Sequence, residues 1–181
     1  MSDLESVRSI AERTGIANEI HFAGEPKGDQ AMLCTAWRIA VEVHGLQLDR
    51  GGECYLFHVA RVGMAMDTPL GQVCGLLHDV LEDSPNAHMW VQVFEVDFPN
   101  AVLDCSVALC RKEGEDYLGA YIPRVAKNPL ALRVKLADLM DNVRPERLAK
   151  LDPEEAVRLR HRYHAAHAYL LNALESQRPA I

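Results

Sequence analysis

The chain has 181 residues, of which 49% are hydrophobic and 25% are charged, and its formal net charge is −7. Alanine and leucine each occur 22 times, against 3 threonines and 6 isoleucines, so the composition favours helices and argues against an all-β domain. The acidic balance argues against a general DNA- or RNA-binding surface. It remains compatible with a small anionic substrate, because a pocket on an acidic protein can be basic.

Residues 1–28 are expected to form an N-terminal helix and loop extension, whose loosest stretch is 14–28, ahead of one domain at 29–181. The N-terminus has neither the basic start nor the apolar core of a secretion signal, and no apolar run is long enough for a membrane span. The five cysteines form no C-x-x-C pair, which is typical of reduced thiols. We therefore predict a cytoplasmic protein with no membrane partner.

From residue 29 onward the sequence reads as helices with short joints. Apolar residues recur at helical spacing up to about residue 47, and a Gly-rich loop follows at 49–53. Further helices are expected at 55–66, 69–83, 87–97, 100–112, 115–126, 129–144 and 153–175. The predicted fold is an all-α, single-domain bundle of about seven to nine helices.

Prolines mark several of the predicted helix ends. Thr68, Asn128 and Asp152 each precede a proline, which predicts a helix N-cap followed by proline at the first helical position. Pro123 should bend or shorten its helix, because proline lacks the backbone amide that the helical ladder needs. Pro145 is expected to stop the helix before it.

One of these helices carries an unusual group of polar residues. Four titratable side chains stand in an otherwise apolar segment: His78, Asp79, Glu82 and Asp83. Residues three or four apart lie on the same or adjacent edges of a helix. Burying three carboxylates and an imidazole so close together is costly unless something neutralises them. A divalent cation is the simplest neutraliser, and histidine with aspartate suits Mn²⁺, Fe²⁺ or Zn²⁺.

Two other apolar helices carry polar residues of the same kind. His58 lies in the helix that follows the Gly-rich loop. Asp138 and Asn142 lie four apart on a later helix, and Lys135 stands one turn before Asp138. Helices that meet around a centre can bring His58 and Asp138 to the same metal as the His-Asp pair described above.

These motifs resemble the HD superfamily of metal-dependent phosphohydrolases, specifically the (p)ppGpp hydrolase branch that includes the hydrolase half of RelA/SpoT enzymes and the small alarmone hydrolases. The matching stretches lie in order within residues 30–170: Val43–Gln47, Gly52–His58, Leu76–Asp83, Val134–Asp138 and Asn142–Arg144. The resemblance implies a helical HD domain that cleaves the 3′ pyrophosphate of (p)ppGpp, giving GDP or GTP and pyrophosphate.

The resemblance also implies a metal site and a pair of catalytic acids. The metal, usually Mn²⁺ in this branch, is held by four matching residues: His58, His78, Asp79 and Asp138. Glu82 and Asp83 match the acidic pair that positions and activates the attacking water. This chemistry is coherent in itself, because a divalent metal lowers the pKa of bound water and a nearby carboxylate can accept the proton.

Five residues are expected to contact the substrate. Asn142 matches a family position that contacts the nucleotide sugar, and Arg50 matches one of two basic positions near the substrate. Lys135 and Arg144 are cations placed in sequence to offset phosphate charge. Tyr163, on the basic last helix, is a candidate nucleotide contact.

The sequence departs from the family pattern where the substrate is expected. Asp49 stands where the family usually has a second basic residue, and Asp141 replaces a histidine commonly found before the asparagine. Asp49 weakens the case for a highly phosphorylated guanosine and leaves open an HD phosphatase for another nucleotide, such as NADPH (2′-phosphate removal) or a deoxynucleoside phosphate. A third reading is a non-catalytic nucleotide-binding regulatory module. A homo-oligomer is also left open.

Overall fold

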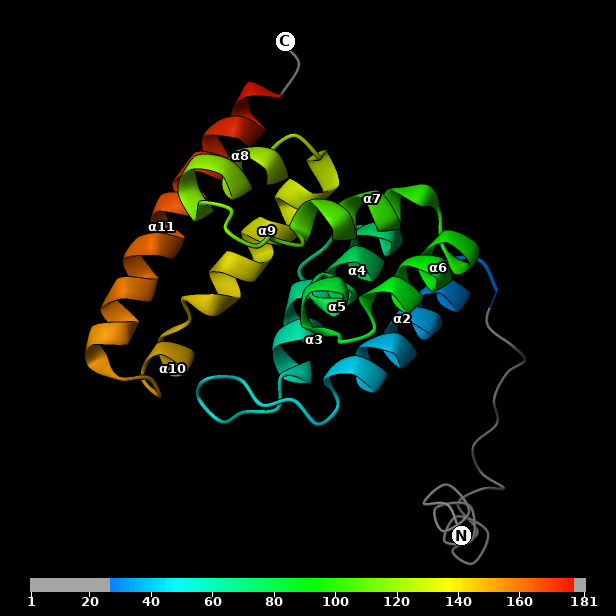
Figure 1. The fold of residues 1–181 in the computed structure, drawn as a ribbon, viewed down its shortest axis with the longest axis horizontal. Helices are drawn as coiled ribbons and strands as arrows, with labels where there is room; N and C mark the ends of the chain where they lie inside the picture. Colours follow the sequence, from blue (N-terminus) through cyan, green and yellow to red (C-terminus); the bar gives the residue numbers. More distant parts are fainter. Residues whose placement is uncertain (1–26, 178–181) are drawn as a thin grey trace, which may run out of the picture.

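The computed structural model describes residues 27–177, which form helices and one isolated antiparallel bridge, between Leu48 and Cys54, with no strand (Figure 1). The predicted all-α fold is confirmed. The expected extension at 1–28 lies almost entirely outside the described residues, so its boundary stays a prediction. Within the described part, no helix has the length and apolar character needed to cross a membrane.

The helices follow one another with short joints and capped ends. In chain order they are α2 (Asp29–His44), α3 (Leu56–Met64), α4 (Pro69–Leu76), α5 (Val80–Asp83), α6 (Ala87–Asp97), α7 (Asn100–Leu109), a π-helical turn (Tyr117–Tyr121), α8 (Ile122–Val125), α9 (Pro129–Asn142), α10 (Pro145–Leu148) and α11 (Pro153–Ser176). The three predicted N-caps are confirmed, because the side chains of Thr68, Asn128 and Asp152 accept hydrogen bonds from first-turn amides of α4, α9 and α11.

The prediction of one continuous helix over 69–83 is wrong. Helix α4 ends at Leu76 and α5 begins at Val80. At the break, Nδ1 of His78 lies 2.7 Å from the backbone oxygen of Gly75. A continuous helix would give that oxygen to the amide of Asp79. The imidazole therefore takes the acceptor that the helical ladder needs, and His78 and Asp79 lie in the joint between two helices.

Two prolines lie at the start of short helices. Helix α9 ends at Asn142, before Pro145 as expected, and Pro145 starts the one-turn helix α10, where a missing amide costs nothing. The helix expected over 115–126 begins only at Tyr117, as a wide turn in which the amide of Tyr121 bonds to the oxygen of Asp116, and Pro123 lies in the first turn of α8.

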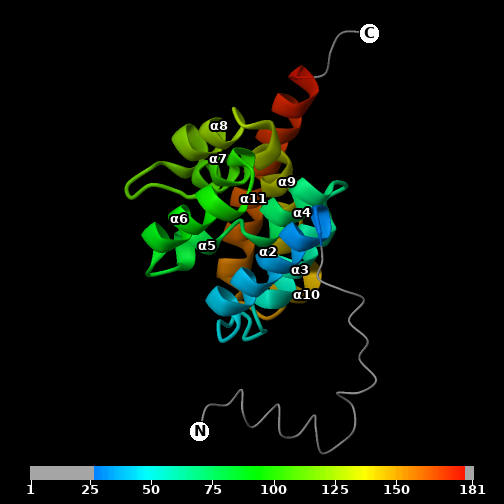
Figure 2. The same cartoon turned by 90° about the vertical axis from the view of Figure 1, so that its right-hand side faces the viewer.

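Helix α9 is the central element of the fold. It packs against α3, α4, α7 and α11, as Figures 1 and 2 show from two directions. Helices α3 and α4 approach so closely that a Cβ atom on Gly75 would lie 2.7 Å from the Cα of Gly63. Only a glycine at residue 75 allows that contact. The contact brings α3, which carries His58, against the helix that ends just before His78.

Candidate active site

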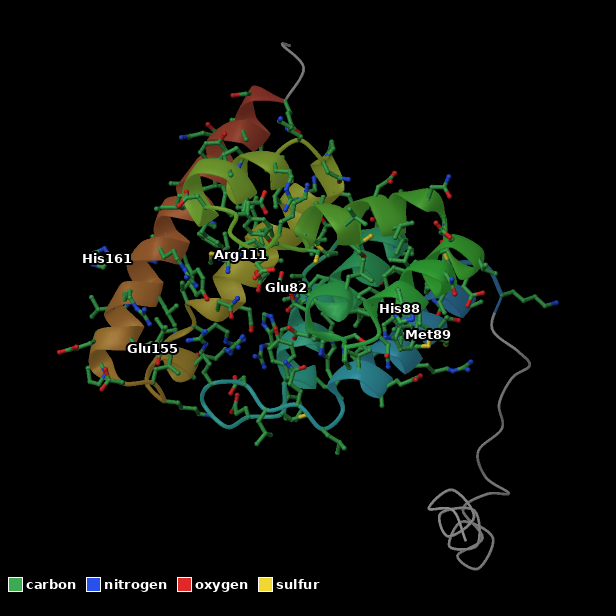
Figure 3. All side chains as sticks on the ribbon, in the orientation of Figure 1. Glu82, His88, Met89, Arg111, Glu155 and His161 are labelled. Carbon is green, nitrogen blue, oxygen red and sulfur yellow. The ribbon has the colours of Figure 1, made fainter. Side chains whose placement is uncertain are left out.

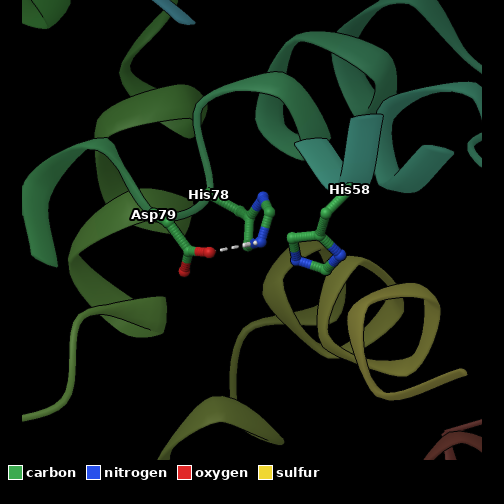
Figure 4. A group of neighbouring side chains, drawn as sticks. All are labelled: His58, His78 and Asp79. Atoms are coloured by element: carbon green, nitrogen blue, oxygen red, sulfur yellow. Dashed lines mark ion pairs between the residues drawn. The ribbon is translucent and has the colours of Figure 1, made fainter. Parts of the chain in front are cut away.

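Two buried histidines lie close together, with Asp79 beside them (Figure 4). His58 and His78 are 1% and 2% exposed, and their ring centroids are 5.2 Å apart. The Nε2 atom of each ring is buried and has no hydrogen-bond partner among residues 27–177. A buried polar atom without a partner is costly, so two such atoms in one place indicate a site for a ligand.

Two carboxylates lie beside these nitrogens without forming a hydrogen bond to either. Asp79 Oδ2 is 2.8 Å from His78 Nε2, and one ligand atom from each of His58, His78 and Asp79 falls within a 4.8 Å cluster. Asp138 Oδ1 lies 3.2 Å from His58 Nε2 and 3.9 Å from His78 Nε2. The structure thus brings all four predicted ligands together, and this set of two nitrogen and two oxygen donors fits a divalent metal.

Contacts outside this cluster fix the orientation of His78 and Asp79. Because the Nδ1 of His78 donates to the Gly75 oxygen, the neutral ring has its lone pair on Nε2. The hydroxyl of Tyr55 donates to Asp79 Oδ2 at 2.5 Å. Burial would lower the pKa of His78, but Asp79 and the other acceptors raise it to about 9 in the metal-free protein. A cation is therefore favoured between these groups.

Asp138 is held by two residues of its own helix. Lys135 Nζ lies 2.8 Å from Asp138 Oδ2, and the side-chain amide of Asn142 donates to Asp138 Oδ1 at 2.5 Å. Burial would raise the pKa of Asp138, but Lys135 and His58 hold it well below its usual range. Asn142, expected to contact the substrate sugar, thus also orients a predicted metal ligand.

The two predicted catalytic acids lie on the wall of the same pocket. Glu82 Oε2 accepts a hydrogen bond from the amide of Arg111, and Figure 3 shows these two residues close together. Asp83 Oδ2 accepts one from the side-chain amide of Gln47 at 2.9 Å. Burial raises the pKa of Glu82. A carboxylate with a raised pKa is a better proton acceptor than an ordinary one.

Sequence reasoning missed the support behind Asp83. His44 is fully buried, and its Nδ1 lies 2.6 Å from Gln47 Oε1. Gln47 in turn holds Asp83. The three-residue spacing of His44 and Gln47 was the only local signal for this contact.

Sequence reasoning also missed the role of Asp141, which it treated only as a replacement. This carboxylate is 6% exposed, and three side chains lie within hydrogen-bond distance of it, while the Arg144 guanidinium is 3.9 Å away. His58 Nδ1 lies 2.7 Å away, Arg61 donates through Nε at 2.5 Å and Nη2 at 3.0 Å, and Arg147 donates through Nη1 at 2.6 Å. Burial would raise the pKa of Asp141, but these partners hold it below its usual range. Arg147 also reaches Asp49, with 3.4 Å between Nε and Oδ2.

The cluster of predicted ligands lies at the floor of a pocket of about 520 Å³, which Asp79 and Asp138 line directly, with the two histidines behind them. Of the five residues expected to contact the substrate, four line it: Arg50, Lys135, Asn142 and Tyr163. Arg50 forms an ion pair with Glu155 at its mouth. Arg111 lines the pocket too, and so do Tyr117 and Arg162, which were not predicted as site residues.

Arg144 is the predicted substrate residue that the structure does not bring to this pocket. It caps α10 in an extended conformation, directly after α9 has ended. Its guanidinium lies 3.5 Å from Glu146 and lines a separate groove beside α3 and α11. The turn of the chain before Pro145 therefore directs this cation away from the metal cluster.

Comparisons with known proteins find the same relatives that the motifs suggested. No family model matches the chain. It is 31% identical over 150 residues to the bifunctional (p)ppGpp synthase/hydrolase RelA of Mycobacterium tuberculosis, and 29% identical over 155 residues to a probable GTP pyrophosphokinase of Mycobacterium leprae. Each match covers 77% of this chain and about a fifth of the relative, 20% and 19%.

A solved structure has a similar fold. It belongs to a metazoan ortholog of SpoT that hydrolyzes ppGpp, with a TM-score of 0.53 and 20% identity, and the match covers 85% of this chain and 96% of that one. The sequence and structural matches together confirm the resemblance predicted from the motifs.

Proposed function

We propose that this chain, a relative of the RelA/SpoT proteins, is a metal-dependent phosphohydrolase that cleaves the 3′ pyrophosphate of (p)ppGpp. One water is consumed, and the products are GDP or GTP and pyrophosphate. The observation that supports this most is the pair of unpartnered Nε2 atoms, from His58 and His78. They lie beside Asp79 and Asp138, which line the same pocket as Glu82 and Asp83.

A divalent metal, with Mn²⁺ as the first candidate, would be held by His58, His78, Asp79 and Asp138. Such a metal supplies a water of lowered pKa and polarises a phosphoryl oxygen. The free lone pairs of the two imidazoles and the two nearby carboxylates are the donors that this role requires.

The remaining residues move the proton and bind the charge. Glu82, with its raised pKa, would accept the proton of the attacking water, while Asp83, held by Gln47, would orient that water. Arg111 and Lys135 would offset the charge of the phosphates. In this scheme Arg50 and Tyr163 contact the nucleotide near the mouth of the pocket.

The acidic Asp49 was the reason for considering other nucleotides, and its contacts weaken that reason. The Asp49 side chain is 7% exposed and ion-paired with Arg147, while its Oδ1 accepts bonds from the amides of Gly51 and Glu53. A carboxylate engaged in this way repels a phosphate far less than a free one. The contacts of Asp49 therefore support the highly phosphorylated substrate.

We expect the enzyme to act in a reducing compartment such as the cytoplasm. All five cysteines are free thiols, and Cys74 and Cys105 are buried as such.

The test is a panel of nucleotides with product identification by chromatography. Purified protein with Mn²⁺ should release pyrophosphate from ppGpp and leave GDP. NADPH and deoxynucleoside monophosphates should release much less phosphate under the same conditions. Binding of ppGpp without turnover in any divalent metal would instead support a regulatory module. Activity that survives exhaustive chelation would contradict the metal mechanism.

A further inference from the structure

We propose that Asp141 is a positioning residue that keeps the His58 ring oriented, with its Nε2 lone pair free for the metal, and that Arg147 couples this residue to the substrate loop at 49–53. The inference rests on the proposed metal site and assigns a role to two acidic residues, Asp49 and Asp141, that depart from the family pattern.

Asp141 forms ion pairs with several basic side chains of this region. Its carboxylate is the only group of the described residues that contacts both Arg61 and Arg147, and it lies directly behind His58. Without this negative charge, two guanidinium groups would face an imidazole that has to bind a cation. Asp141 thus offsets repulsion between the arginines and the proposed metal.

The contacts of His58 allow two positions for the ring proton. Nδ1 lies 2.7 Å from both Asp141 Oδ2 and Arg147 Nη1, which lie 2.6 Å from each other. If Nδ1 accepts from Arg147, the neutral ring carries its proton on Nε2, which faces Asp138 Oδ1 at 3.2 Å. If Nδ1 instead donates to Asp141, Arg147 directs its hydrogens to the same carboxylate. The second arrangement leaves Nε2 free for a metal, as in carboxylate–histidine–metal triads.

Arg147 connects Asp141 to the loop in the pocket wall. Its guanidinium is 13% exposed and binds Asp141 through Nη1 and Asp49 through Nε. Asp49 in turn holds the amides of Gly51 and Glu53, so the loop is fastened at its base. The two acidic departures are therefore partners of a single arginine, and the loop that lines the substrate pocket is tied to a metal ligand.

The first test measures metal affinity in a folded variant. Asp141→Asn keeps the shape of the side chain but removes its charge, and the Kd for Mn²⁺ should rise about 10- to 100-fold, the range seen when such supporting partners are removed. Glu115→Gln is the matched control. It also removes one carboxylate bonded twice to an arginine, Arg124, but touches no metal ligand, so its Kd should stay at the wild-type value.

A second measurement observes the His58 ring directly. Long-range ¹H–¹⁵N spectra of the metal-free, labelled protein should show His58 with its proton on Nδ1 in the wild type, and a larger share on Nε2 in Asp141→Asn. Arg147→Gln keeps Asp141 beside His58 but releases the loop, so it should weaken Mn²⁺ binding less than Asp141→Asn does and raise the KM for ppGpp. If Asp141→Asn does not fold, the Mn²⁺ affinity and the KM of Arg147→Gln test the inference in its place.

Two outcomes separate this inference from the proposed function. If wild-type protein binds no divalent metal, the proposed function fails. If wild-type protein binds Mn²⁺ and the folded Asp141→Asn variant binds it equally well, with only a lower melting temperature, Asp141 is merely structural and this inference is overturned. A wild-type His58 with its proton on Nε2 would overturn it as well.

Discussion

The floor and the rim of the pocket are built in different ways. The floor consists of side chains from α3, the α4–α5 joint and α9, and its members His58, His78 and Asp138 are at most 3% exposed. The rim consists of the loop before α3 and the start of α11, where the Arg50 side chain is 66% exposed. Packed helices hold the floor, and ion pairs hold the rim. Substrate preference can therefore change at the rim while the chemistry of the floor stays the same.

The largest effect should come from removing a floor ligand. Asp79→Ala should abolish both pyrophosphate release and tight Mn²⁺ binding, because the variant leaves two histidines and one carboxylate for the metal. Calorimetry with Mn²⁺ and chromatography of products measure the two losses. Asp97→Ala, at the exposed end of α6, is the control and should match the wild type. Full activity in Asp79→Ala would break the distinction between floor and rim.

A smaller loss is expected from an acid that does not hold the metal. Glu82→Gln should lower kcat by about 10²- to 10⁴-fold, the usual contribution of a general base, with little change in the Kd for Mn²⁺. Because burial raises the pKa of Glu82 and the base must be ionised, wild-type kcat/KM should fall with decreasing pH already above 4.5, the ordinary value. Glu82→Gln should lose that acidic limb. A limb that persists in the variant would assign the proton transfer to another group.

A rim substitution should have a modest effect. Arg50→Gln removes an exposed cation that is proposed to contact the substrate, and an ion pair formed by an exposed group contributes about 0–1 kcal/mol. The KM for ppGpp should rise by roughly this amount, up to about 5-fold, with kcat unchanged. Steady-state kinetics at saturating Mn²⁺ measure the split. A large fall in kcat would place Arg50 with the floor residues.

The smallest effect on activity is expected from Glu115→Gln. Glu115 lies outside the pocket and forms an ion pair with Arg124. Folding lowers the pKa of Glu115 from 4.5 to about 2. Its ionisation therefore stabilises the folded state above pH 4.5, and this contribution is lost as the pH falls toward 2. Melting temperatures across that range should fall less steeply in Glu115→Gln. If the melting temperatures of wild type and variant depend on pH in the same way, the Glu115–Arg124 ion pair adds no stability.

Sequence reasoning located the floor because histidines and carboxylates buried together on apolar helices are costly unless they bind a cation. It failed where long-range contacts decide. Asp141 reads as a simple replacement until Arg61, 80 residues away, is seen to bind it. The break after Leu76 was not predicted for a similar reason. The residue pattern over 69–83 is helical, and the break is explained only by the hydrogen bond from the His78 side chain to the Gly75 carbonyl oxygen. Arg144 was expected on the helix that carries Asp138, but α9 ends at Asn142 and Arg144 is the N-cap of α10.

The backbone contact between Gly63 and Gly75 has a consequence for the choice of ion. It sets how far α3 lies from α4, and hence the opening between the imidazole nitrogen on α3 and the one just beyond the end of α4. A single methyl group on residue 75 would push the helices apart and widen that opening. In the proposed metal site, two residues that donate nothing to the ion would thus set the size of the opening that receives it.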